Sequence, residues 1–87
     1  MVSQKIRIIN PTGLHLRPAG LLCKEAIKFK ARITIKMHNN ISNAKCGLSV
    51  LGACVVCGDE IELICDGDDE EKAFATLKNL LESGLEE

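Results

Sequence analysis

Three short segments in which apolar and polar residues alternate constrain the fold more than any other feature of the sequence. They span residues 2–9, 31–37 and 60–65. Successive side chains of a β-strand point to opposite faces, so this alternation predicts strands that bury one face and leave the other in water. The turn chemistry of His38, Asn39 and Asn40 is expected to reverse the chain into a shorter strand at residues 41–43.

Apolar residues recur at helical spacing in the other segments. A first helix is predicted over residues 16–28, with Pro18 in its first turn, where a missing N–H costs little. A brief helix is expected around residues 48–53. The last helix carries an apolar stripe over residues 73–81 and ends before Gly84, and the acidic run at residues 66–71 is interpreted as its cap and solvated surface.

The predicted order is therefore strand, helix, strand, strand, short helix, strand, helix. Strands with one polar face indicate an antiparallel sheet that is covered by helices on one side and open to water on the other. We predict an α+β open-faced β-sandwich with a four-stranded antiparallel sheet and three helices on one face. Residues 1–87 are expected to form one domain, since a chain of this length supports one modest core.

Charge and composition exclude several classes of function. The net charge of −1 offers no electrostatic footprint for nucleic acid, and two aromatic residues make no base-stacking platform. No segment approaches the roughly 18 apolar residues of a membrane span, and the amino-terminal residues lack the apolar run of a signal peptide. We expect a cytoplasmic protein that does not insert into a membrane.

The five cysteines are an odd number in mostly apolar surroundings, which suits reduced thiols better than a disulfide framework. We predict that most of them are small core residues. They are Cys23, Cys46, Cys54, Cys57 and Cys65.

The chemistry of the chain is concentrated around His15. The imidazole lies where the first helix is expected to begin, and unpaired N–H groups together with the positive end of the helix dipole make such a place an anion site. Arg17 adds a permanent cation that can donate two hydrogen bonds to a phosphate. The same positive field disfavours protonation of the His15 ring, so a neutral, nucleophilic imidazole next to an anion site is suited to accept a phosphoryl group. His38 has no such neighbours.

Residues 13–19, with the sequence GLHLRPA, resemble the active-site signature of HPr, the histidine-containing phosphocarrier family of the bacterial phosphoenolpyruvate-dependent sugar phosphotransferase system. The resemblance covers essentially the whole chain. It implies that His15 takes a phosphoryl group on Nδ1 from phosphorylated enzyme I and passes it to a IIA unit of a sugar permease. Backbone N–H groups of Leu16 and Arg17, with the Arg17 guanidinium, would hold the group. Such a protein is a phosphorylated carrier, expected to be a monomer without cofactor or metal, and not an enzyme.

The resemblance also implies a surface that binds the donor and acceptor proteins. Leu48 and Leu51 are expected to supply apolar contacts there, and Lys24 and Lys45 a basic rim. The full partner-binding set comprises Thr12, Leu16, Gly20, Lys24, Ile27, Gly47, Leu48 and Leu51.

The chain departs from the family pattern at several of these positions. Leu16 replaces the small residue that usually follows the active histidine. Cys46 stands where many HPr proteins carry a serine that HPr kinase phosphorylates, and a thiol is not a substrate for that reaction. Gly47 removes a side chain from the apolar patch, and Ile27 stands where many relatives carry a basic residue.

Two alternatives remain open at this point. One is a regulatory HPr paralogue that is not dedicated to sugar flux. The other belongs to a different class, a thiol-based metal or redox domain that uses the CxxC pair of Cys54 and Cys57. Strong zinc sites commonly use two such pairs, and the sequence has one.

Overall fold

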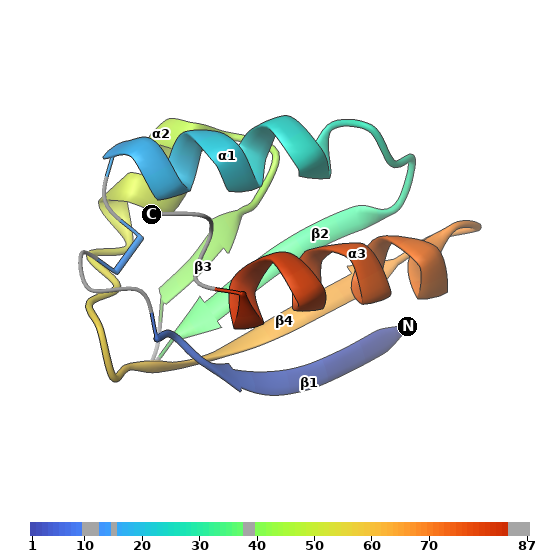
Figure 1. Ribbon diagram of the computed structural model, residues 1–87. Helices are drawn as coiled ribbons and strands as arrows, with labels where there is room; N and C mark the ends of the chain where they lie inside the picture. The colour runs from blue at the N-terminus through green and yellow to red at the C-terminus, as the bar shows by residue number, and fades with distance from the viewer. Residues whose placement is uncertain (10–12, 15, 38–39, 84–87) are drawn as a thin grey trace.

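The computed structural model describes residues 1–9, 13–14, 16–37 and 40–83, and contains four strands and three helices. In chain order these are β1 (Val2–Arg7), α1 (Leu16–Ala26), β2 (Arg32–Met37), β3 (Asn40–Asn43), α2 (Gly47–Gly52), β4 (Glu60–Asp66) and α3 (Glu70–Glu82). The predicted order of elements and the predicted fold class are confirmed (Figure 1).

The four strands form one antiparallel sheet in the order β1-β4-β2-β3. The last strand in the sequence therefore lies inside the sheet, between the first and the second. Ile61 and Leu63 of β4 stand opposite Ile6 of β1 and Ile35 of β2, respectively. This register aligns the apolar positions of neighbouring strands on one face, as the period of two requires.

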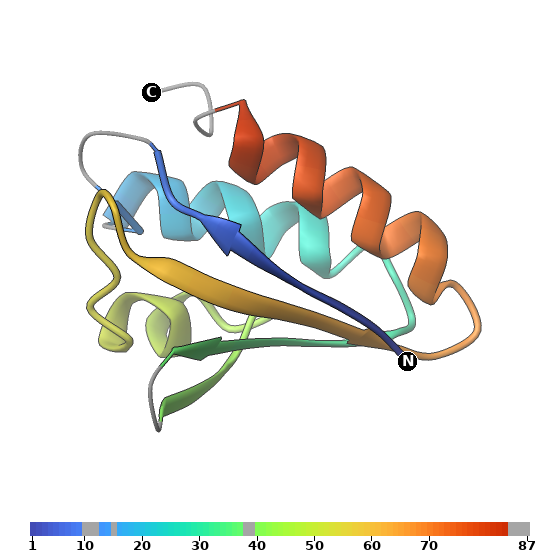
Figure 2. The same ribbon diagram turned by 90° about the horizontal axis from the view of Figure 1, so that it is seen from below.

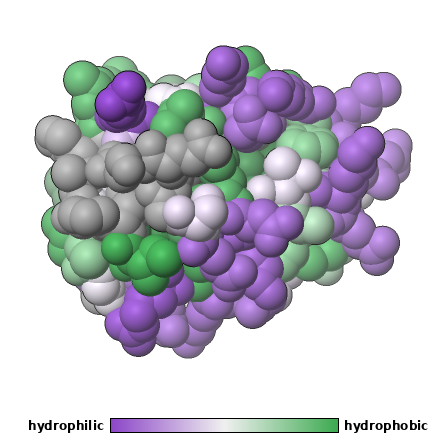
Figure 3. Space-filling view, in the orientation of Figure 1, coloured by the Kyte–Doolittle hydropathy of each residue, from purple (hydrophilic) through white to green (hydrophobic). Residues whose placement is uncertain are grey.

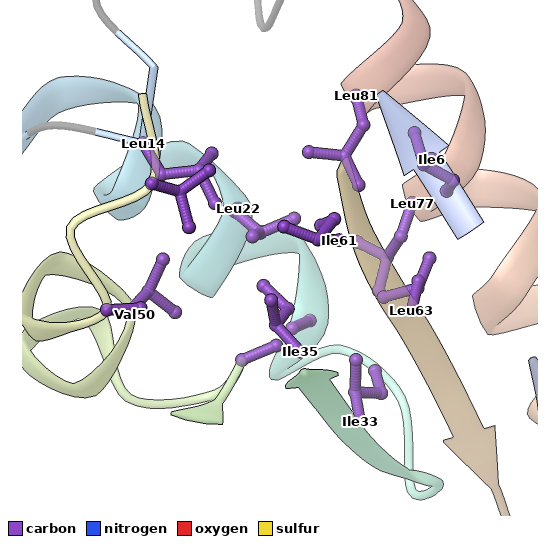
Figure 4. Packing of buried hydrophobic residues seen from close by; sticks show 14 of the residues in the cluster. Ile6, Leu14, Leu22, Ile33, Ile35, Val50, Ile61, Leu63, Leu77 and Leu81 are labelled. Carbon is purple, nitrogen blue, oxygen red and sulfur yellow. The ribbon is translucent and has the colours of Figure 1, made fainter. Parts of the chain in front are cut away.

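The helices cover that apolar face. Figure 1 shows α1 above the sheet and α3 in front of β4, and in Figure 2, seen from below, β1 and β4 pass in front of α1. Side chains from both layers meet in one core, to which the helices contribute Leu22, Leu77 and Leu81 (Figure 4). The uncovered face is polar, and Lys5, Glu62 and Lys36 stand side by side across β1, β4 and β2.

Some element ends differ from the sequence prediction. The first strand ends at Arg7 because the Ile8 N–H donates to Asp59 O and the Ile8 carbonyl accepts from Gly58 N–H, both in the turn before β4. Helix α1 ends at Ala26: the Ile27 N–H still donates to Cys23 O, and the Lys28 and Phe29 N–H groups then bond three residues back, to Glu25 O and Ala26 O. The predicted turn at residues 38–40 lies partly outside the described residues, whereas the last helix ends at Glu82, before Gly84 as predicted.

The prediction that most cysteines are core residues is wrong. Cys65 alone is buried, Cys23 is half-buried, and Cys46, Cys54 and Cys57 are exposed as free thiols. Cys54 and Cys57 are exposed because residues 53–59 form a surface connection in which the Val55 side chain is buried and the side chains of these two cysteines face the solvent. Burial raises the pKa of the Cys65 thiol to about 11.

The acidic run before α3 is hydrogen-bonded to the loop that follows the carboxyl end of α1. Asp69 is the N-cap residue of α3, yet its carboxylate accepts hydrogen bonds from the N–H groups of Lys30 (2.9 Å) and Ala31 (2.8 Å) instead of capping its own helix. These two hydrogen bonds lower the pKa of Asp69 below its ordinary value, and the bond from Lys30 has the larger effect.

In the described parts of the chain, no helix has the length and apolar character needed to cross a bilayer.

Candidate functional site

The segment that precedes α1 packs against, and is hydrogen-bonded to, the connection between α2 and β4. Leu14 is buried in the core, and its N–H donates to Val55 O at 2.9 Å (Figure 4). Gly13 has φ +64°, and a Cβ built on it would lie 2.3 Å from Val55 O and 2.6 Å from the Val56 Cα. Only glycine suits both the backbone conformation and the close approach. This contact fixes the chain two residues ahead of His15, which itself lies outside the described residues, as does Thr12.

Helix α1 begins at Leu16, as the sequence predicted. Pro18 is its third residue and is buried, while the side chains of Leu16 and Arg17 are exposed. The first N–H groups of a helix have no acceptor within the helix, and the dipole makes this end electropositive. The first turn of α1 holds no acidic residue that would cancel this charge. The start of α1 is therefore suited to bind an anion.

Arg17 adds a cation that is available to a ligand. Within the described part of the chain, its guanidinium has neither an ion-pair nor a hydrogen-bond partner. An exposed, unengaged guanidinium can turn toward a phosphate and donate two hydrogen bonds to it. The arrangement that the sequence predicted around Arg17 is thus compatible with phosphate binding.

An apolar groove lies beside this helix start, between α1 and α2. Its volume is about 250 Å³, and we call it the α1/α2 groove. It is lined by Leu16, Ala19, Gly20, Gly47, Leu48 and Leu51. Leu16 is 71% exposed and Leu48 is 79% exposed, which is unusual for leucines and typical of a surface that contacts another protein. Figure 3 shows hydrophobic residues at the end of the molecule where α1 begins and hydrophilic residues over most of the opposite end.

The groove brings together five of the residues predicted to bind partners, namely Leu16, Gly20, Gly47, Leu48 and Leu51. Lys24 and Ile27 are exposed but lie outside its lining. Lys45, predicted as part of a basic rim, is half-buried, and its Nζ donates to the Phe29 carbonyl at 2.6 Å. Ala19 also lines the groove but is not in the predicted set, although its position three residues after Leu16 on a helix was the available signal.

Hydrogen bonds at the start of α2 position this helix, which forms the second side of the α1/α2 groove. The Asn43 side-chain oxygen accepts from Lys45 N–H at 2.9 Å, and the Ser49 hydroxyl accepts from Asn43 N–H at 3.1 Å. Val50 is fully buried and holds α2 on the core (Figure 4). With Val50 turned inward, Leu48 is left on the surface facing the groove.

The cysteines of the CxxC pair contact different segments. The Cys54 Sγ lies 3.6 Å from Gly52 O, and the Cys57 Sγ lies 3.7 Å from Ile9 O. Among the described residues, no group of three or more His, Cys, Asp or Glu side chains is arranged to hold a metal ion.

Comparison with known proteins identifies similar sequences and structures. The family model described as "PTS HPr component phosphorylation site" matches residues 2–83. Phosphocarrier protein HPr of Treponema pallidum is 33% identical over 87 residues, covering 100% of this chain and 99% of that protein. The crystal structure of HPr-C-His from Thermoanaerobacter tengcongensis superposes with a TM-score of 0.96 at 39% identity, covering 100% of this chain and 98% of that one.

A regulatory relative is similar as well. The crystal structure of Crh from Bacillus subtilis, described as a catabolite repression protein that forms a domain-swapped dimer, matches with a TM-score of 0.78 at 32% identity. The match covers 95% of each chain. The fold is thus shared by carriers and by at least one protein named for regulation.

Proposed function

This chain belongs to the PTS HPr family, and we propose that it is a cytoplasmic phosphocarrier in which His15 accepts a phosphoryl group from enzyme I and passes it to IIA units of sugar permeases. The observation that carries the proposal is the match of the phosphorylation-site model to residues 2–83, which include the GLHLRP segment. HPr proteins are phosphocarriers, so the proposed chemistry is one covalent intermediate rather than turnover in an enclosed pocket.

The transfer step needs a nucleophile and a place for negative charge. The lone pair of the neutral His15 Nδ1 forms the new N–P bond as the bond to the donor breaks. The arriving group brings roughly 1.5 to 2 negative charges, by analogy with phosphoserine. The N–H groups of Leu16 and Arg17 at the start of α1 and the unengaged Arg17 guanidinium are the proposed ligands for this charge.

The phosphorylated form must remain reactive. Binding that stabilises the phosphohistidine more than the transition state slows the onward step, because only interactions that strengthen in the transition state accelerate transfer. The exposed position of Arg17 supports this requirement, since a water-accessible ion pair is worth only about 0–1 kcal/mol. The phosphoryl group would be held in place without being trapped.

We propose that the α1/α2 groove is the docking surface for donor and acceptor. Its exposed leucines, Leu16 and Leu48, border the start of α1, so a protein seated on them would face the residue that precedes Leu16. The proposed surface extends to Lys24 and Ile27 along α1, and the positive charge of Lys24 suits acidic partners. A leucine at position 16 enlarges the apolar contact and narrows the choice of partners.

A regulatory role is the second candidate, supported by the similarity to Crh. A protein of that kind would be modified and bind a target without passing the group on. Transfer to a IIA unit separates the two candidates.

Incubation with enzyme I and phosphoenolpyruvate, followed by intact mass measurement, tests the acceptor. We expect wild type and His38→Ala to gain one acid-labile phosphoryl group and His15→Ala to gain none. His38 is the matched control because it is the only other histidine in the chain. A phosphate that persists in His15→Ala would contradict the proposed site, and an unmodified wild type beside a working HPr would contradict the proposed donor.

Arg17 is tested in the same assay. Arg17→Lys keeps the charge but loses the planar pair of donors, and Arg17→Ala loses both. We expect the initial rate of phosphorylation to fall in the order wild type, Arg17→Lys, Arg17→Ala. Equal rates for all three would remove Arg17 from the proposed site.

A further inference from the structure

Two cysteines from different elements lie near each other where α1 packs against the start of α2. Cys23 is half-buried in α1, and Cys46 is the exposed N-cap residue of α2. The Cys23 Sγ donates a hydrogen bond to the Lys45 carbonyl at 3.0 Å. The Cys23 Cβ lies 3.9 Å from a Cβ built on Gly47. Cys23 therefore contacts Lys45 and lies close to Gly47, the residues on either side of Cys46.

Peptide geometry bounds the distance between the two thiols. A carbonyl oxygen and the following Cα of a trans peptide are roughly 2.8 Å apart, which places the Cys23 sulfur within about 6 Å of the Cys46 Cα. The Cys46 side chain makes no capping hydrogen bond, so it can rotate about χ1 toward α1. Disulfide-bonded cysteines usually have Cα atoms about 4.4–6.8 Å apart, so the proposed bond requires Cys23 and Cys46 to come within this range.

We propose that Cys23 and Cys46 are a reversible dithiol–disulfide pair that links α1 to α2 at the end of the α1/α2 groove. The CxxC motif offers Cys54 and Cys57 as the alternative pair. Those two thiols contact carbonyls of separate segments, at Gly52 and Ile9. In a reducing compartment such a bond is transient, as in redox-sensing proteins.

Hydrogen peroxide is the oxidant we assign to the step. The exposed Cys46 sulfur attacks one peroxide oxygen, the O–O bond breaks, and a sulfenic acid and one water form. The Cys23 sulfur then attacks the Cys46 sulfur and the S–O bond breaks. The hydroxyl leaves with the Cys23 proton as a second water. Both sulfurs are oxidised and the peroxide is reduced, and exchange with a thiol reductant restores the dithiol.

The bond would act on the groove because both cysteines adjoin its lining. Cys23 follows Gly20 by three residues on α1, and Cys46 directly precedes Gly47. A covalent link there fixes the spacing of the two walls and prevents the groove from adjusting to a partner's side chains. This consequence for phosphoryl transfer rests on the proposed function, whereas formation of the bond does not.

The pairing is tested by peroxide treatment of the reduced full-length chain, alkylation of the remaining thiols, and peptide mapping. Trypsin leaves four cysteines on one fragment, because no Lys or Arg lies between Lys45 and Lys72. The experiment therefore uses, beside wild type, the Cys54→Ser/Cys57→Ser double variant, which leaves only Cys46 and Cys65 on that fragment, and substitution of Cys46 then tells these two apart. We expect both proteins to form a bond that joins the Cys23 peptide to the Cys46 peptide within one chain, reversible by dithiothreitol.

Single substitutions assign the bond. Cys23→Ser and Cys46→Ser are each expected to lose the linked peptide. A bond between Cys54 and Cys57, a link between two chains, or sulfenic and sulfinic acids without a linked peptide would overturn the pairing.

The effect on transfer is measured with enzyme I and phosphoenolpyruvate before and after oxidation. We expect the initial rate of phosphorylation of wild type to fall at least about tenfold on oxidation, the scale of losing one central contact, and to recover with dithiothreitol. Cys46→Ser treated in the same way should keep its rate. A linked protein with an unchanged rate would overturn the effect on the groove, whereas reduced protein that accepts no phosphoryl group would contradict the proposed function and leave the mapping result intact.

Discussion

Substitution of Gly13 by alanine tests how the chain ahead of His15 is held. The residue has φ +64°, and the added Cβ would lie 2.3 Å from Val55 O and 2.6 Å from the Val56 Cα. Both atoms belong to the backbone, so the contact cannot be relieved by rotating a side chain. The segment or the connection must move, and the hydrogen bond from Leu14 N–H to Val55 O is the first to be strained.

The cost of Gly13→Ala has two parts. An alanine in the left-handed region loses roughly 1 kcal/mol relative to glycine. Displacing packed backbone costs about 1–3 kcal/mol more, as in overpacked cores. The expected loss of unfolding free energy is therefore about 2–4 kcal/mol. For a domain of this size this corresponds to a fall in Tm of at least about 8 °C.

Thermal unfolding followed by circular dichroism measures the effect, with Gly52→Ala as the matched control. Gly52 ends α2, its φ is not positive, and no heavy atom lies within 4 Å of its Cβ position. That substitution should leave the Tm unchanged or raise it slightly, because it can add about 0.4–1 kcal/mol to the free energy of unfolding. If Gly13→Ala melted within about 2 °C of wild type, the close approach to Val55 would be refuted.

Three further predictions follow from other parts of the molecule. Leu48 is exposed, so Leu48→Ala should leave the free energy of unfolding within about 0.5 kcal/mol of wild type and raise the Kd for enzyme I roughly tenfold, as measured by titration calorimetry. Val50 is buried, so Val50→Ala should lower the free energy of unfolding by about 2 kcal/mol. Equal binding by Leu48→Ala and wild type would exclude Leu48 from docking. The lowered pKa of Asp69 means that its stabilising effect is present above its ordinary value of 3.8 and is lost as the pH falls through the lowered pKa. The Tm difference between wild type and Asp69→Asn should therefore shrink toward about pH 2, and a constant difference would contradict this role. The buried Cys65 thiol, with its pKa of about 11, should react with iodoacetamide at about pH 8 after the exposed cysteines, and peptide mapping that finds it among the first would contradict its burial.

The strands and the two longer helices could be predicted because each carries its own period in the sequence. Alternation in β2 and β4 sets which residues face the core regardless of which strands are neighbours. Element ends depend on partners elsewhere in the chain. The bonds between Ile8 and the turn at residues 58–59 end β1 early, and no local pattern reports them.

The exposure of Cys54 and Cys57 could not be predicted for a related reason. In the CVVC segment one valine is buried and the other exposed, and the hydrogen bond between Leu14 N–H and Val55 O fixes which of them turns inward. An apolar run without a clear period does not contain that information. The α1/α2 groove likewise depends on how two helices pack, so its residues could be predicted only through the resemblance to HPr proteins.

Transfer of the phosphoryl group from this chain to a IIA unit is the most direct test of the carrier function. The phosphorylated protein is isolated from enzyme I, mixed with a IIA unit, and followed by intact mass of both proteins over time. We expect the phosphoryl group to disappear from this chain and to appear on the IIA unit in equal amount. A phosphorylated chain that keeps its group, while a known HPr in the same mixture passes its own to the IIA unit, would contradict the carrier function.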